Sequence, residues 1–254
     1  MARMTKGLKI ALAATAAFVL AIGAELLWLH HRNVVDQNTQ VPRQNEFVKP
    51  TMTADDGVFL RKERPDSLAD ERTLIGKTIW VSAGGQMDYY KDTGKHVDYS
   101  KPVGVLLGAE PLVIRDVFEE KAPANSRATF RIAPGQRQVL LAFTMPKSSD
   151  PNQLYAVPVG NFDEGVYNFF TDEIFFYDDP HVLYKHWGPE MWAHIDKHEA
   201  VPGMSENQAM MSLGQTITPH GDNVGDRSVT YDNNGHPVTI DFQNNKAVKI
   251  TPGS

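Results

Sequence analysis

Histidine is the residue whose spacing in this chain comes closest to that of a metal site. His194 and His198 are four residues apart, so on a helix their side chains would lie about one turn apart on one face. His186 is near in sequence and is a candidate third ligand. The run 193–199 lacks the glutamate that the HExxH motif of zinc hydrolases places between its two histidines. The alternative is that these histidines stabilise the last carbonyl groups of a helix.

The sequence contains no motif for nucleophilic catalysis by cysteine or serine. The chain has no cysteine, which removes disulfides, thiolate metal sites and cysteine nucleophiles. No G-x-S-x-G run is present to place a nucleophilic serine on a tight strand-to-helix turn. We therefore predict no catalytic residue and no cofactor.

The aromatic stretch Val166–Tyr177 is a candidate for binding rather than for chemistry, because half of its residues are Phe or Tyr. Buried, they would seal a core; exposed, they would anchor a protein partner. Alternation along the stretch is imperfect, so both interpretations stay open. The candidate interaction residues are Phe169, Phe170, Phe175, Phe176 and Tyr177.

The elements that would position these residues begin with an apolar segment, Leu8–Leu29. As a helix it would be about 33 Å long, enough to cross a hydrocarbon core of about 30 Å. Leu8 and Phe18 would contact lipid, and Trp28 would lie at the interface. More basic residues precede the segment than follow it, so the positive-inside rule predicts that the rest of the chain is extracytoplasmic. The alternatives are a signal peptide cleaved near Ala21–Gly23 and a buried soluble helix.

After the apolar segment the sequence predicts a linker and then a β domain. Residues 33–72 are mostly polar, contain three prolines and show no sustained periodicity, which is typical of a tether. Short β-type runs separated by turn residues follow, without a connection long enough for a helix between them. They are 74–82, 103–107, 111–119, 128–132, 139–145 and 154–159. This pattern resembles a small SH3-like barrel.

Start signals for helices appear near the C-terminus. Asp179 before Pro180 predicts an N-cap with proline in the first turn. Ser205 with Gln208 three residues later predicts a capping box.

A half-buried antiparallel meander of three strands is predicted after the second of these helices. Val238, Ile240 and Phe242 alternate with polar residues, and 244–245 is an Asn-Asn turn.

The phrase GMSENQAMMSLG, followed by a YDNNGHPVTIDFQNNKAVKI hairpin, resembles the SmpA/OmlA (BamE-like) family. The matching positions are Gly203, Met204, Ser205, Gln208, Leu213 and Gly214. The resemblance implies two helices on a three-stranded sheet, an envelope location and an adaptor role without catalysis. The chain departs from that family in having no cysteine to acylate and in carrying an additional β domain.

Together these observations predict an α+β protein with four parts: a cytoplasmic start and membrane anchor over 1–32, a linker over 33–72, an SH3-like domain over 73–177, and a BamE-like module over 178–254. We expect an inner-membrane, single-pass envelope adaptor that contacts the lipid bilayer and an envelope protein partner. The net charge of −6 argues against nucleic-acid binding. The alternatives are a metal-dependent hydrolase of envelope polymers and a peptidoglycan- or ligand-binding module.

Overall fold

The computed structural model describes Glu25, residues 52–126 and residues 134–253. Residues Thr53–Ser254 cluster as one compact unit, separate from Met1–Met52, and the elements below belong to the former. The predicted strand at 128–132 lies outside the described residues.

The prediction of a membrane anchor is not supported. Among the described residues, no helix is long and apolar enough to cross a membrane. Leu8, Phe18 and Trp28 lie outside the described residues, and Glu25 is the one described position of the apolar segment. The expected single-pass topology and inner-membrane location are therefore withdrawn.

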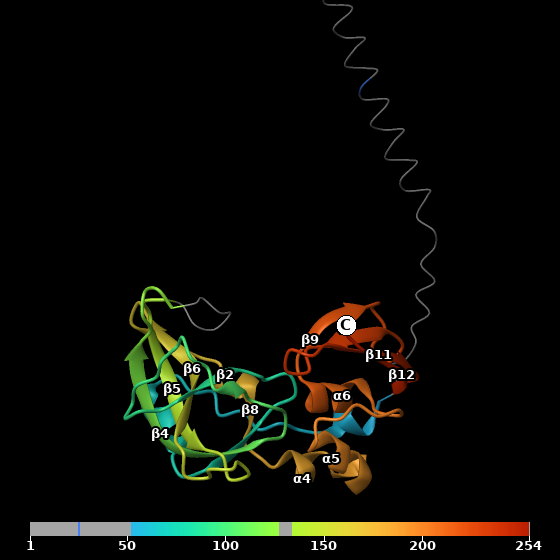
Figure 1. Cartoon of the computed structure of the whole chain (residues 1–254), viewed down its shortest axis with the longest axis horizontal. Coiled ribbons are helices and arrows are strands. Elements are labelled where there is room, and N and C mark those ends of the chain that lie inside the picture. The colour runs from blue at the N-terminus through green and yellow to red at the C-terminus, as the bar shows by residue number, and fades with distance from the viewer. Residues whose placement is uncertain (1–24, 26–51, 127–133, 254) are drawn as a thin grey trace, which may run out of the picture. The chain divides into compact units, whose positions relative to one another are not determined.

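The first part of the compact unit is an antiparallel, strongly curled sheet (Figure 1). Its strand order is β3-β2-β6-β5-β4-β1-β8, with β7 paired to β6. The strands are β1 (Thr78–Val81), β2 (Asp88–Lys91), β3 (Gly104–Val105), β4 (Pro111–Lys121), β5 (Arg137–Thr144), β6 (Tyr155–Asp163), β7 (Val166–Phe169) and β8 (Phe175–Phe176). Sequence analysis missed β2, whose residues read as a polar loop.

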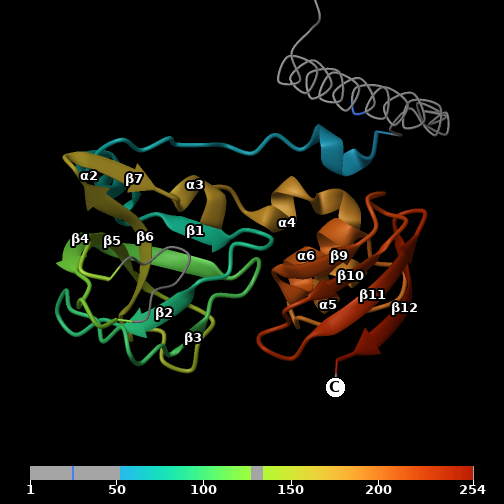
Figure 2. The same ribbon diagram turned by 90° about the horizontal axis from the view of Figure 1, so that it is seen from above.

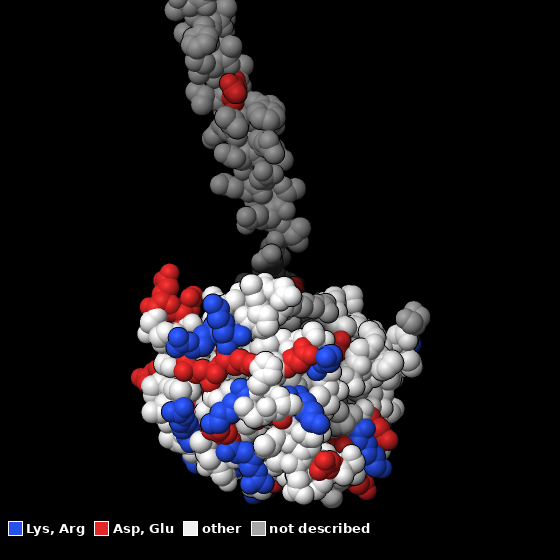
Figure 3. Space-filling view, turned by 60° about the vertical axis from the view of Figure 1, so that its left-hand side comes forward, with Lys and Arg blue, Asp and Glu red and all other residues white. Residues whose placement is uncertain are grey.

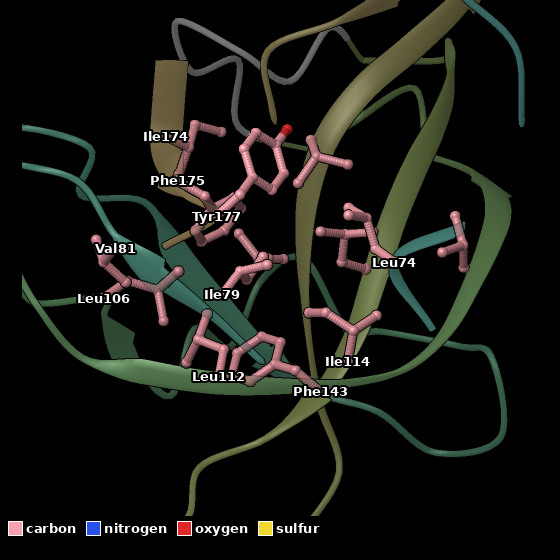
Figure 4. Close-up of a cluster of buried hydrophobic side chains, with 14 of the residues drawn as sticks. Leu74, Ile79, Val81, Leu106, Leu112, Ile114, Phe143, Ile174, Phe175 and Tyr177 are labelled. Carbon is pink, nitrogen blue, oxygen red and sulfur yellow. The ribbon is translucent and has the colours of Figure 1, made fainter. Parts of the chain in front are cut away.

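Strand β5 is buried on both faces of this sheet. Val139, Leu141 and Phe143 point into the main core, whereas Leu140 and Ala142 belong to a second cluster with Tyr90 and others. Figure 4 shows the main core, in which Leu112, Ile114 and Phe143 lie together beneath Leu74 and Ile79. The continuous apolar run in β5 therefore reflects burial on two sides.

The second sheet is also antiparallel and has the order β12-β11-β10-β9. Its strands are β9 (Thr216–His220), β10 (Ser228–Tyr231), β11 (Val238–Gln243) and β12 (Lys246–Pro252). The predicted alternation in β11 is confirmed, since Val238, Ile240 and Phe242 are buried and the residues between them are not. Asn244 and Asn245 both have positive φ, as their two-residue turn requires.

Short helices accompany both sheets. They are η1 (Ala54–Gly57), α2 (Leu68–Glu71), η2 (Arg72–Leu74), α3 (Thr171–Ile174), α4 (Pro180–Leu183), η3 (Lys185–Trp187), α5 (Pro189–Ile195) and α6 (Glu206–Leu213). The predicted caps are confirmed: Asp179 accepts from the His181 amide, and Ser205 forms a capping box with Gln208. Residues of α5 and α6 pack with the second sheet in one core (Figure 1).

The predicted fold class is nevertheless wrong in both parts. The first part is an open, curled sheet of eight strands rather than a small SH3-like barrel. The second part has four strands and several short helices, so the expected module of two helices on three strands is not present. The additional strand, β9, was missed because all five of its residues are exposed. A strand with no buried face has no alternation of apolar and polar residues to reveal it.

Candidate functional site

An extended segment, residues 58–66, links η1 to α2 without forming regular secondary structure. We call it the strap. Figure 2 shows it running alongside β7, α3 and α4, near the junction of the two sheets. It is held mainly by polar contacts at its two ends.

Asp55, in η1, holds the N-terminal end of the strap. Its carboxylate accepts hydrogen bonds from His186 Nε2 (2.5 Å), Trp187 Nε1 (2.7 Å) and Asn207 Nδ2 (2.9 Å). Burial acts to raise the pKa of Asp55, but these donors outweigh it and hold the pKa below its usual value. The carboxylate therefore stays ionised and links η1 to η3 and α6.

Asp172, at the start of α3, holds the other end of the strap. Its two carboxylate oxygens accept from the backbone amides of Glu63 and Arg64, each at 3.0 Å. The Tyr177 hydroxyl donates to the same carboxylate at 2.8 Å, and burial together with Asp172 raises the pKa of Tyr177. Arg61 Nη2 adds a hydrogen bond to the Tyr177 carbonyl oxygen at 2.8 Å.

Beside the strap lies a hollow of about 240 Å³, which we call the junction pocket. Its apolar lining comes from the strap, β8, the α4–η3 region and α6: Leu60, Phe176, Tyr184, Trp187, Met210 and Met211. Its polar lining includes Lys62, Ser82, Glu173 and Asn207. The pocket therefore lies between strand β8 of the curled sheet and the helical residues that pack with the second sheet.

A row of packed rings forms the wall of the junction pocket and continues away from it. Tyr184 stacks on Trp187 with ring centroids 4.4 Å apart, and Phe176 is 6.2 Å from Tyr184. Trp192 is 5.2 Å from Trp187, and His181 is 4.1 Å from Trp192. These contacts fix the ring positions before any ligand binds.

The three candidate metal-binding histidines have separate partners. His186 contacts Asp55, His194 Nδ1 lies 3.0 Å from Glu199 Oε2, and His198 Nδ1 lies 3.0 Å from the Ser212 carbonyl oxygen. Within the described ranges, no group of three or more acidic or histidine side chains could hold a metal ion. The structure does not bring these histidines together as a ligand set.

The candidate interaction residues of the aromatic stretch lie largely inside the protein. Phe175 and Tyr177 are buried in the core of the curled sheet, and Phe176 is buried in the core of the second sheet. Phe169 and Phe170 are partly buried against the first of these cores. Of the five, Phe176 reaches a binding surface, because it lines the junction pocket.

The junction pocket does not show a nucleophile activated by a base. Ser82 Oγ donates to the Glu173 carbonyl oxygen at 2.9 Å. A serine nucleophile would instead donate its proton to a histidine or another base. The arrangement is suited to binding an apolar group.

Sequence analysis missed the strap, its anchors Asp55 and Asp172, and Met210. Asp55 is separated from its partners by more than 130 positions in the chain, so no local pattern indicates the contact. The resemblance to the SmpA/OmlA family stays a prediction. No family model matches the chain, and no match is found among curated proteins or solved structures.

Proposed function

We propose that this chain is a non-catalytic protein-binding module whose junction pocket receives an apolar side chain of a partner protein. The single observation that carries the proposal is the pocket itself, a hollow between strand β8 and α6 with an aromatic and methionine lining. Binding hot spots between proteins commonly consist of apolar anchors inserted into such pockets.

The lining combines a rigid wall with an adaptable one. Tyr184 and Trp187 are fixed by stacking and by the Asp55 hydrogen bond. Met210 and Met211 come from α6, and methionine side chains adjust readily to the shape of an inserted group. At about 240 Å³ the pocket is smaller than the usual range for drug-sized ligands, which favours a single side chain over a larger small molecule.

Neighbouring features also support a protein partner. Phe59, which precedes the pocket residue Leu60 in the strap, is 90% exposed and is an apolar side chain available to a partner. Figure 3 shows acidic and basic side chains interspersed on one face, with no continuous basic surface there for nucleic acid.

The proposal is tested by placing a photo-crosslinking amino acid at Met210 in the full chain, expressed in its native cells. We expect a discrete adduct with one partner protein. A crosslinker at Val248, which is exposed and does not line the pocket, is the matched control and should not give that adduct.

Binding of the purified partner should then be measured for Met210→Asp and Met210→Leu. A charge in the pocket should weaken binding at least about tenfold, whereas leucine should preserve it. Circular dichroism of both variants checks that the fold is retained. The same adduct from both crosslinking positions, or unchanged binding by a folded Met210→Asp variant, would contradict the proposal.

A further inference from the structure

A second hollow, of about 350 Å³, is bordered by the C-terminal end of the strap and by α2. We call it the acidic pocket. Its acidic lining residues are Glu63, Asp66, Asp70 and Glu71, Arg64 is the basic one, and the neutral phenol of Tyr177 also lines it. Four carboxyl groups against one guanidinium make a negative lining, but such a cluster alone does not define a site.

Glu71 supplies the observation that points to a ligand. Its side chain lines the pocket yet the residue is 1% exposed. Oε1 accepts a hydrogen bond from the hydroxyl of buried Thr171, whereas Oε2 has no hydrogen-bond partner. A buried carboxyl oxygen without a donor is costly, and it is rare in folded proteins.

The charges that act on Glu71 do not compensate it. Burial raises the pKa of Glu71, the hydrogen bond from Thr171 lowers it, and the nearby carboxylates Asp172 and Asp70 raise it, so that the pKa is about 7. Asp172 accepts hydrogen bonds from the strap amides and from Tyr177 and, as a carboxylate, has no proton to donate to Glu71. Glu71 therefore lies among acidic groups with one oxygen unsatisfied.

Asp66 and Asp70 form a second acidic contact at the same pocket. Asp70 Oδ2 accepts from the Ser67 amide at 3.1 Å and from the Asp66 amide at 3.4 Å. A hydrogen bond with the Asp70 carboxyl, and then the charge of Asp70, raise the pKa of the Asp66 carboxyl, while the pKa of Asp70 is lowered, so a proton held by Asp66 relieves the repulsion between the two groups. A positive group bound here would relieve this repulsion as well as that on Glu71.

We propose that the acidic pocket binds an organic cation, namely the guanidinium or ammonium head of a basic side chain or amine. Such a group donates hydrogen bonds to Glu71 Oε2 and neutralises the charge of Asp66 and Asp70. Among the residues that the structure covers, no carboxylate and histidine cluster could hold a metal ion, which favours an organic cation.

The test measures binding to the full chain by calorimetry at low ionic strength and pH 7.5. The probes are acetyl-arginine amide and Nα-acetyl-lysine amide, with acetyl-citrulline amide as the neutral isostere of arginine. We expect at least one cation to bind at least about tenfold more tightly than citrulline. Glu71→Gln, which keeps the acceptor for Thr171, should remove most of that preference, and Asp66→Asn should reduce it severalfold.

Glu164→Gln is the matched control, since Glu164 lies in the exposed turn between β6 and β7 and should leave binding unchanged. The proposal would be overturned if neither cation bound, or if citrulline bound as tightly as both cations. It would also be overturned if Glu71→Gln kept the full preference for the cation. Binding of Mg²⁺ or Ca²⁺ that is lost in the same variants would overturn it in favour of a metal site. None of these readouts involves Met210, so the outcome is separate from that for the junction pocket.

Discussion

The two sheets of the compact unit bury their residues in different ways. In the curled sheet β5 is covered on both faces, whereas in the second sheet β11 buries alternate residues and exposes the others more. The two cores meet at β8, where Phe175 enters the first core and Phe176 enters the second. Consecutive residues of a strand point to opposite faces, so a two-residue strand is enough to connect the cores.

The two pockets described above are found beside this connection rather than inside either core. The junction pocket uses residues from both sides of it, and the acidic pocket lies beside the strap that accompanies it. Cores pack tightly and leave little space, whereas the strap and the short helices beside the curled sheet leave hollows that binding can use.

The largest expected effect concerns the independence of the two cores. Phe143→Ala empties part of the first core and should lower the free energy of unfolding by about 3–5 kcal/mol. Because Thr53–Ser254 is one compact unit joined through β8, we expect a single unfolding transition followed by both far-UV circular dichroism and tryptophan fluorescence, to which Trp80, Trp187 and Trp192 contribute from the second core. Ile240→Ala, in the second core, is the matched variant, and two separated transitions in either would show that the cores unfold independently.

A pH-dependent effect is expected at Glu71. The pKa is about 7 in the folded protein against an ordinary value of 4.5, so the folded state holds the proton more tightly. Stability from this group is complete below pH 4.5, falls as pH rises, and is lost above about pH 7, with a total on the order of 3 kcal/mol.

Glu71→Gln stays neutral and should therefore be more stable than the parent at pH 8, by up to about 3 kcal/mol, and similar to it at pH 4.5. Urea unfolding at the two pH values measures the difference. A constant difference between the proteins across this range would contradict the raised pKa. Glu164→Gln, at an exposed position, should show no such change.

A smaller effect is expected at Gly108, where the β3–β4 connection contacts α6. A Cβ added at Gly108 would lie 2.1 Å from the Met211 carbonyl oxygen, so Gly108→Ala must push α6 away from the β3–β4 connection. We expect a loss of about 1–3 kcal/mol and altered binding at the junction pocket, because Met210 and Met211 line it.

Gly57→Ala is the matched control for this substitution, since nothing lies within 4 Å of the added methyl group. Thermal unfolding of both variants measures the contrast. Equal melting temperatures would mean that Gly108 and Met211 can move apart without lowering the stability of the protein.

The smallest effect on global stability is expected at the strap. Asp55→Ala removes three hydrogen bonds that hold η1, and the loss should be about 1 kcal/mol because the segment is short and mostly exposed. Faster hydrogen exchange or proteolysis over residues 53–66 should reveal local release. Asp56→Ala, which affects the cap at Thr53, should release the strap less.

The confirmed predictions depend on neighbours in the chain. The capping box of Ser205 with Gln208, the Asp179 cap and the turn at Asn244–Asn245 each involve residues at most three positions apart. The alternation in β11 is similarly local, because burial of one sheet face imposes a period of two.

The features that local patterns did not predict depend on residues far apart in the chain. Whether Phe175, Phe176 and Tyr177 would be exposed could not be predicted, because each is covered by elements from other parts of the chain. Strand β9 forms by pairing with β10, although its own five residues are all exposed. The apolar segment Leu8–Leu29 lies outside the described residues apart from Glu25, so the membrane expectation gained no support.

The amino-acid sequence by itself determined where several helices begin, where tight turns occur and which residues of β11 face inward. These features follow from backbone geometry and hydrogen bonds within a few residues. The tertiary structure alone decided that the first sheet curls open, that β8 connects two cores, and that Asp55, Trp187 and Met210 meet near one pocket. Long-range packing sets these contacts, and no local pattern of residue types specifies the partners of a side chain more than 100 residues away.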